Sequence, residues 1–264
     1  MEKISVCGKG GSGKSTIVGL LAKGMRERGY QVLVVDSDES NPGLYRMLGF
    51  ERRPDPLLEL VGGKKNVFRT FSKDSAPSGS ILTQDEIRTS DLPRPQVEEA
   101  NGIRLVCIGK ILQSLEGCAC PMGALSREFL KRLRLQEDEI AVIDMEAGIE
   151  HFGRGVETSV DSVLIVVEPS FDSLELAEKI NALASEVGMN HIWAVLNKIP
   201  SEELGLKLSD ELKGKGLNVI GSISYDPDIS FSSLEGRLLR GDKALKEAAE
   251  ILNHLLEGSG VFKT

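Results

Sequence analysis

The sequence predicts an α/β fold in which a mostly parallel central sheet of about seven or eight strands is flanked by helices. Three observations support this prediction. Short apolar runs rich in Val and Ile alternate with amphipathic stretches along the chain. These runs are continuous, as expected for strands that are covered on both faces. Apolar residues make up 41% of the 264 residues, which is enough to bury both faces of such a sheet.

The expected strands and helices alternate, so the chain reads as one domain, 1–264. The expected strands are 4–7, 32–35, 103–108, 140–143, 162–167, 192–196 and 219–223. The first helix is expected from near Lys14 to a stop at Gly29, another spans about 174–187, and the last ends at Gly258. Residues 51–102 are rich in Pro, Ser and charge, with weak periodicity. We interpret them as an irregular insertion with short helices and mobile loops.

Composition disfavours several classes of partner. The formal charge is -8, with 40 acidic and 32 basic residues, so no nucleic acid and no membrane surface is expected as a partner. No apolar run is long enough to span a bilayer, and the stretch 4–7 is too short for a signal peptide. A cytoplasmic location is therefore expected. In a reducing compartment, the four cysteines are buried thiols or metal ligands.

A glycine-rich loop lies between the first expected strand and the first expected helix. Backbone N–H groups of such a loop can curl around phosphate oxygens, and the helix N-terminus adds partial positive charge. Lys14 is expected to neutralise the β- and γ-phosphates, and the Ser15 hydroxyl to ligate Mg²⁺. The sequence thus predicts a P-loop nucleotide site. Its expected residues are Gly8, Gly10, Gly11, Ser12, Gly13, Lys14, Ser15 and Thr16.

A second lysine, Lys9, stands directly after the first glycine of this loop. The run from Lys9 to Ser15 resembles the deviant Walker A sequence of the MinD, ParA and nitrogenase iron protein class of ATPases. The resemblance implies that Lys9 reaches across a nucleotide-sandwich homodimer to the phosphates of the partner subunit. There it would stabilise transition-state charge, as an arginine finger supplied in trans does. The alternative is an exposed, solvated lysine.

Carboxylates follow two other expected strands. Asp36 and Asp38 follow the strand at 32–35, and Asp144 follows the strand at 140–143. Residues at these strand ends face the ligand crevice of an open α/β sheet, although a lone aspartate there is often only a helix cap. In the class that the loop resembles, the aspartate matching Asp38 orients the attacking water, and the one matching Asp36 lies near magnesium. Asp144 is interpreted as the Walker B residue that holds Mg²⁺ through water, and Gly148 as a γ-phosphate-sensing hinge.

The base is expected to be adenine. Asn197 and Lys198 close a later strand and resemble the base-binding pair of P-loop proteins. Relatives that bind GTP carry an aspartate two residues beyond the lysine, where this chain has Pro200, which cannot accept hydrogen bonds from guanine. An asparagine amide pairs well with the N6/N7 edge of adenine. With Pro227 as a further binding residue, the expected ligand is ATP with Mg²⁺.

Cys118 and Cys120 lie one residue apart, in an expected loop before a helix that begins near Pro121. Thiolates so placed are candidate ligands of a soft metal. Two ligands are too few for a stable zinc or nickel site, whereas a homodimer would bring four. Inert reduced cysteines are the alternative. Cys7 and Cys107 lie inside apolar strands and are expected in the core.

Several of these features together resemble the CooC family, ATPases that assist nickel insertion into carbon monoxide dehydrogenase. The likeness covers most of the chain and is weakest at 51–102. It implies that Cys118 and Cys120 bind Zn²⁺ or Ni²⁺ between two subunits, and that carbon monoxide dehydrogenase is the client. The features are Lys9, the aspartate pair, the cysteine pair ahead of Asp144, the run from Asp144 to His151, residues 167–169 and the pair Asn197 and Lys198. Glu146 receives no role, and His151 is expected to be a hydrogen-bonded surface residue rather than a nucleotide sensor or client contact.

Two other functions stay open. An iron–sulfur electron-transfer ATPase like nitrogenase iron protein would take one cysteine from each of two separated loops, yet 145–160 contain no cysteine. A positioning or partition ATPase of the MinD/ParA type would need a basic amphipathic tail or a basic face for DNA. The few residues after Gly260 and the charge of -8 disfavour both features.

Overall fold

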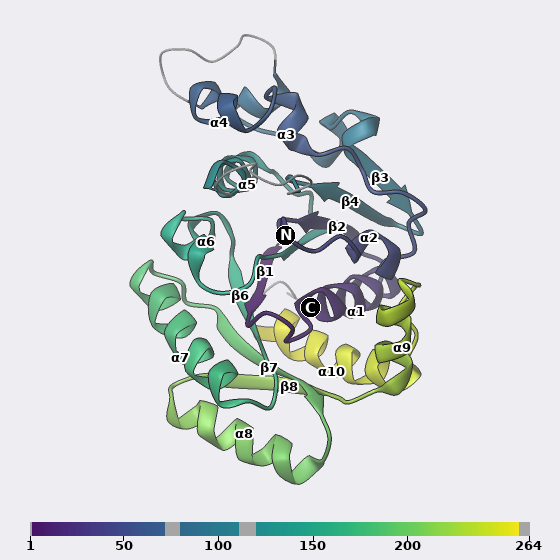
Figure 1. Cartoon of the computed structure of the whole chain (residues 1–264), viewed down its shortest axis with the longest axis vertical. Coiled ribbons are helices and arrows are strands. Elements are labelled where there is room, and N and C mark those ends of the chain that lie inside the picture. The colour runs from purple at the N-terminus through teal and green to yellow at the C-terminus, as the bar shows by residue number, and fades with distance from the viewer. Residues whose placement is uncertain (1, 72–79, 111–119, 259–264) are drawn as a thin grey trace.

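The computed structural model describes residues 2–71, 80–110 and 120–258 of the chain, arranged around one central sheet (Figure 1). The sheet has eight strands in the order β3-β4-β2-β5-β1-β6-β7-β8. All neighbouring pairs are parallel except β3 and β4, which pair antiparallel. The strands are β1 Glu2–Gly8, β2 Gln31–Asp36, β3 Val97–Ala100, β4 Ile103–Cys107, β5 Glu139–Asp144, β6 Ser162–Val167, β7 Ile192–Ile199 and β8 Asn218–Ser224.

The predicted α/β fold is confirmed, and each expected apolar run forms a strand. Strand β1 lies between β5 and β6, near the middle of the sheet, so the glycine-rich loop that follows it emerges at the centre of the ligand edge. The edge strand β3 was not expected, because its sequence, with Glu98 and Glu99 in the middle, lacks the apolar pattern of the others. It lies within the stretch interpreted as irregular.

Helices cover both faces of the sheet (Figure 1). The α-helices are α1 Lys14–Glu27, α2 Leu44–Met47, α3 Leu57–Leu60, α4 Lys64–Thr70, α5 Cys120–Arg132, α6 Glu150–Gly153, α7 Phe171–Glu186, α8 Glu202–Gly214, α9 Pro227–Glu235 and α10 Asp242–Gly258. Short 3₁₀ turns occupy Ile81–Thr83, Thr89–Asp91, Arg94–Gln96 and Glu157–Ser159.

The sheet separates two apolar cores, because successive residues of a strand point to opposite faces. In β2, Leu33 and Val35 belong to one core, whereas Val32 and Val34 belong to the other. The first core is covered by α5, α7 and α8, and the second by α1 and α10. Strands buried on both faces in this way hold the loops at their carboxyl ends in fixed positions.

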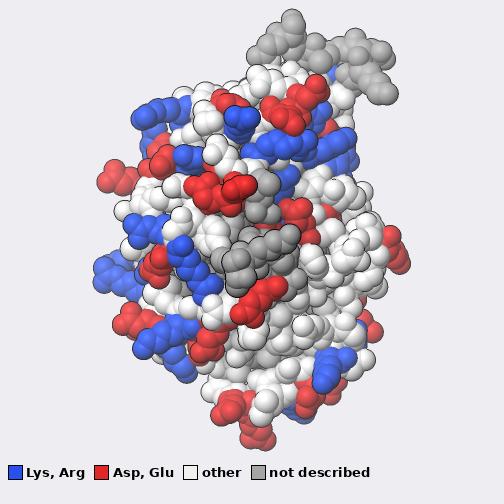
Figure 2. Space-filling view, turned by 180° about the vertical axis from the view of Figure 1, so that it is seen from behind, with Lys and Arg blue, Asp and Glu red and all other residues white. Residues whose placement is uncertain are grey.

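The stretch 51–102 adds α3, α4, three 3₁₀ turns and β3. Its apolar residues Leu57, Val67, Leu82 and Ile87 are fully buried and share the core of the α5 face. Across 2–71, 80–110 and 120–258, the structure contains no helix that could cross a membrane. Acidic and basic side chains are mixed over the face shown in Figure 2.

Candidate functional site

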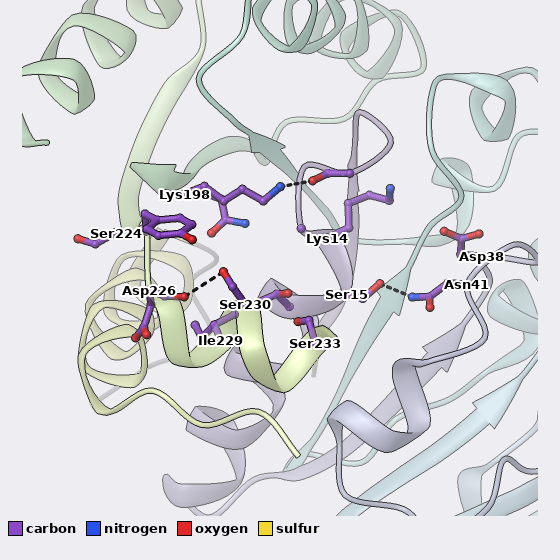
Figure 3. Close-up of a pocket in the computed structure, with 15 residues that line it drawn as sticks. Lys14, Ser15, Asp38, Asn41, Lys198, Ser224, Asp226, Ile229, Ser230 and Ser233 are labelled. Atoms are coloured by element: carbon purple, nitrogen blue, oxygen red, sulfur yellow. Dashed lines mark hydrogen bonds between the residues drawn. The ribbon is translucent and has the colours of Figure 1, made fainter. Parts of the chain in front are cut away.

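Loops at the carboxyl ends of the strands converge on a cavity of about 400 Å³. A volume of several hundred Å³ suits a ligand of nucleotide size. Figure 3 shows this cavity between the glycine-rich loop, the loop after β2, the end of β7 and helix α9. Its lining comprises Gly11, Gly13, Lys14, Ser15, Thr16, Asp38, Asn41, Asn197, Lys198, Ser224, Tyr225, Asp226, Ile229, Ser230 and Ser233.

The glycine-rich loop needs glycine at two positions for steric reasons. Gly8 has φ 140°, and a Cβ there would lie 2.5 Å from the carbonyl oxygen of Val166. Gly13 has φ 94° at the N-cap of α1, and a Cβ there would lie 2.2 Å from Asn197 Nδ2. The loop therefore fits tightly between β6 and β7, with its backbone at the N-terminus of α1, where an anion is stabilised. Lys14 opens α1 and lines the cavity while only 6% exposed.

Ser15, Asp144 and Asn41 form a hydrogen-bonded chain beside the phosphate loop. The Ser15 hydroxyl donates to Asp144 Oδ2 at 2.6 Å. Asn41 Nδ2 donates to Ser15 Oγ at 2.6 Å, as Figure 3 shows. Asp144 is fully buried, and its Oδ1 has no hydrogen-bond partner among the described residues. Burial raises the pKa of Asp144 to about 7. A hydroxyl beside an incompletely satisfied buried carboxylate is a donor set that fits Mg²⁺, a hard cation that prefers oxygen ligands.

The aspartate pair after β2 divides between two environments. Asp38 lines the cavity, and its Oδ1 accepts hydrogen bonds from the backbone N–H of Ser40 at 2.9 Å and the Ser40 hydroxyl at 2.6 Å. Asp36 is absent from the described lining and instead pairs with Lys110, with 2.7 Å between Nζ and Oδ1. Burial raises the pKa of Asp36 to about 6, although the charge of Lys110 pulls that pKa down. Asp36 is the register partner of Asp144, and its predicted place near magnesium stays a prediction.

Asn197 and Lys198, which are predicted to bind the base, line the cavity at the end of β7. Asn197 is buried, and its Nδ2 donates to the backbone carbonyl of Ser12 at 2.8 Å. Lys198 Nζ donates to the carbonyl of Gly11 and lies 3.2 Å from Glu168 Oε2. Pro227 is the first residue of α9 and lies outside the described lining, which includes later residues of the same helix. The predicted contacts of these residues with adenine stay predictions.

Lys9 lies beside the cavity but is not among the described residues that line it. Its Nζ is 3.3 Å from Glu168 Oε1 and 3.9 Å from Asp172 Oδ2, and its side chain is 32% exposed. The lysine predicted to act in trans is thus paired with its own chain at the start of α7. Glu168 also pairs with Lys198, so one carboxylate joins both lysines.

His151 is a correction to the sequence analysis. It is 1% exposed rather than a surface residue, and its Nδ1 is hydrogen-bonded to Glu157 Oε1. The expectation failed because Glu157, in the 3₁₀ turn that follows α6, is six residues away and pairs with His151 only in the folded chain. Glu146, which received no role, pairs with Arg154. Burial and a hydrogen bond with Glu39 raise the pKa of Glu146 to about 8.

The structure describes three of the four cysteines, and Cys120 among them is disulfide-bonded rather than a free thiol. Cys7 and Cys107 are fully buried, as predicted, and burial raises the pKa of Cys107 to about 12. Cys120 is exposed at the first residue of α5. Cys118 lies outside the described residues, so the predicted metal pair stays a prediction. Within the described ranges, no group of three or more His, Cys, Asp or Glu residues is placed to hold a metal ion.

Comparison with known proteins places this site among nucleotide-binding domains. Residues 4–239 match the family described as the CobQ/CobB/MinD/ParA nucleotide binding domain. The chain is 40% identical over 251 residues to an ATP-binding protein of Methanocaldococcus jannaschii, covering 95% of this chain and 99% of that protein. It is 35% identical over 239 residues to the carbon monoxide dehydrogenase accessory protein CooC of Rhodospirillum rubrum, covering 89% of this chain and 88% of that protein.

Among solved structures, the fold is similar to that of the septum site-determining protein MinD from Pyrococcus horikoshii in complex with Mg-ADP. The TM-score is 0.71 at 18% identity, covering 100% of this chain and 99% of the MinD chain. An identity this low supports the shared fold and leaves function to the site itself.

Proposed function

This chain belongs to the CobQ/CobB/MinD/ParA family of nucleotide-binding domains and is an ATPase, and on that premise we propose that it serves nickel insertion into carbon monoxide dehydrogenase. The observation that carries the proposal is the 35% identity to CooC over 89% of the chain. The sequence supports it with the cysteine pair Cys118 and Cys120, a feature that a nucleotide switch alone would not need.

In the proposed mechanism, residues of the cavity hold ATP by its phosphates. The backbone N–H groups of the glycine-rich loop and the Lys14 ammonium stabilise the β- and γ-phosphates. Ser15 and Asp144 would hold Mg²⁺, which neutralises phosphate charge when bound. Asp38, fixed by Ser40, orients the water that attacks the γ-phosphorus.

The proposed cycle requires two copies of the chain. MgATP bound to each copy would bring the two cavities face to face, so that Lys9 of one copy reaches the phosphates bound by the other. In a twofold dimer the same surface meets itself, so Cys118 and Cys120 of both copies can supply four thiolates. Four thiolates suit Zn²⁺ in tetrahedral geometry or Ni²⁺ in square-planar geometry. Hydrolysis would separate the copies and open the metal site near the client enzyme.

Metal and nucleotide titration, with the mass of the complex monitored, tests this function. We expect a dimer in the presence of ATP or a non-hydrolysable analogue, with one Zn²⁺ or Ni²⁺ bound per dimer. The Cys118→Ser/Cys120→Ser variant should lose the metal and keep ATP binding, while Cys7→Ser, in the core, is the matched cysteine control for metal stoichiometry. One metal per monomer, or a metal that survives the double substitution, would contradict the proposed site.

A positioning or partition ATPase is the second candidate, because the family description includes MinD and ParA. Such a protein would respond to a membrane surface or to DNA instead of a thiolate-bound metal. Its ATPase activity should then rise with anionic vesicles or with duplex DNA in a salt-sensitive way. The nickel function predicts no such response.

A further inference from the structure

We propose that Lys110 is a positioning residue of the ATPase, which holds the backbone of Asp38 and thereby the carboxylate that orients the attacking water. The inference rests on the role proposed above for Asp38. Lys110 follows β4, and its side chain is 2% exposed. Its Nζ lies 2.7 Å from Asp36 Oδ1 and donates a second hydrogen bond to the backbone carbonyl of Asp38.

A lysine with so little exposure requires a reason. Removing an ammonium group from water is costly, and a counterion such as Asp36 offsets that cost only in part. Well-packed apolar residues at these two positions would stabilise the fold about as well as the ion pair does. The second hydrogen bond of Lys110 goes to the loop that carries Asp38. The conformation of this loop shapes the cavity and does not affect the sheet.

The placement follows from strand order. Strands β4 and β2 are parallel neighbours, and Asp36 at the end of β2 is the register partner of Cys107 at the end of β4. Lys110 lies three residues beyond Cys107, and its side chain extends from the end of β4 to the loop after the neighbouring strand β2. Ser40 fixes the Asp38 carboxylate from one side, and Lys110 fixes the Asp38 carbonyl from the other. Two independent contacts therefore set the direction of this carboxylate toward the cavity.

The ion pair also organises charge beside the phosphate site. Asp36 lies opposite Asp144 in the sheet register, and the negative charge of Asp36 contributes to the raised pKa of Asp144 after the larger effect of burial. The Lys110 ammonium offsets that negative charge. If Lys110 only balanced the charge of Asp36, removing both charges together would leave kcat unchanged. If Lys110 positions Asp38, removing both would still lower kcat.

The decisive variant is therefore Lys110→Met/Asp36→Asn, which removes both charges and also the hydrogen bond to the Asp38 carbonyl. We expect kcat for ATP hydrolysis to fall about 10- to 100-fold below that of Asp36→Asn alone, which keeps the Lys110 bond to the Asp38 carbonyl, because small misplacements of a catalytic group have effects of this size. KM for MgATP should stay within about threefold, since the phosphate loop is untouched. Glu2→Gln, at a buried hydrogen bond with Ser162 remote from the cavity, controls for general destabilisation and should leave kcat unchanged.

A double variant whose kcat lies less than about tenfold below that of Asp36→Asn alone would overturn the inference. If that variant does not fold, Lys110→Arg supplies the test, because it keeps the charge opposite Asp36 but cannot place a donor where Nζ lies without moving the Asp38 loop. We expect a kcat reduced at least about fivefold with unchanged KM, and a wild-type kcat would overturn the inference. Asp38→Ala is measured in parallel. If Asp38→Ala hydrolyses ATP normally, the proposed role of Asp38 is wrong. If Asp38→Ala is inactive but the Lys110 variants hydrolyse ATP normally, only the role of Lys110 is wrong.

Discussion

Lys9 Nζ lies 3.3 Å from Glu168 Oε1, and the other oxygen of the same carboxylate lies 3.2 Å from Lys198 Nζ. Burial would raise the pKa of Glu168, but hydrogen bonds and charge from Lys198 and then Lys9 lower it overall. A single carboxylate thus joins the lysine expected to act in trans to Lys198, which lines the cavity. Lys9 must leave this pair before it can reach a partner subunit.

Glu168→Gln should therefore favour the active dimer. The pair is partly exposed, and such pairs are worth about 0.2–1 kcal/mol. Because a twofold dimer breaks two such pairs, their loss should lower the protein concentration at half-maximal ATP turnover by about 2- to 30-fold. Turnover measured against protein concentration gives this value directly.

The effect of Glu168→Gln should depend on Lys9. In a Lys9→Ala background, we expect Glu168→Gln to leave the residual turnover unchanged. Asp172→Asn is the matched control, because Asp172 is 78% exposed and lies 3.9 Å from Lys9 Nζ, so its contribution should be smaller. An equal response to Glu168→Gln with and without Lys9 would show that the carboxylate acts elsewhere.

Lys9→Ala and Asp38→Ala should each reduce hydrolysis by about 10³-fold while ATP binding stays measurable. Mixing the two inactive variants provides a sharper test. In a mixed dimer, the site that keeps Asp38 receives Lys9 from the other subunit and is complete. Because half of the dimers are mixed and each has one complete site, about one quarter of wild-type turnover should return. No recovery on mixing would rule out action in trans.

Asn41→Ala should weaken the binding of Mg²⁺ to the nucleotide complex. Asn41 Nδ2 holds Ser15 Oγ at 2.6 Å, next to the proposed Mg²⁺ position. Loss of one such hydrogen bond, about 1 kcal/mol, should raise the half-saturating Mg²⁺ concentration about fivefold. Nucleotide binding without Mg²⁺ should not change. Asn66→Ala, on α4, is the control, and a matching change there would point to a general loss of stability.

The strands were predictable because both faces of the sheet are buried. Runs such as Ile140 to Ile143 need apolar residues at every position, so they stand out in the sequence. Strand β3 is different, because it lies at the edge and, within the described part of the chain, pairs only with β4. It forms a strand because it pairs with Ile103 and the residues that follow, and the pattern of apolar residues does not reveal such pairing.

The lining of the cavity was predictable where a single loop supplies it. Gly13, Lys14 and Ser15 follow from a local pattern, and Asn41 could have been suspected from its place in the same loop as Asp38. Lys110 could not, because its partners lie more than 70 residues away and meet it only through the pairing of β2 with β4. The buried pair of His151 and Glu157 likewise depends on how the chain turns after β5.

Asp144 should make the nucleotide-free protein less stable as the pH rises. Its folded-state pKa is raised by burial to about 7, above the ordinary value of 3.8, so the folded protein retains a proton that the unfolded chain has lost. Stability from this group is therefore present at low pH and is lost between about pH 4 and 7.

We expect the Tm of the wild-type protein, measured without Mg²⁺, to fall by several degrees between pH 5 and pH 8, at about 2–4 °C for each kcal/mol. Asp144→Asn does not titrate, so its Tm should fall less over the same range. The difference between the two slopes of Tm against pH separates the contribution of Asp144 from those of Asp36 and Glu146, whose pKa values are also raised. Mg²⁺ with ADP should reduce the wild-type slope, because a bound cation stabilises the ionised carboxylate. Parallel slopes for wild type and Asp144→Asn would show that Asp144 is already ionised in the folded protein.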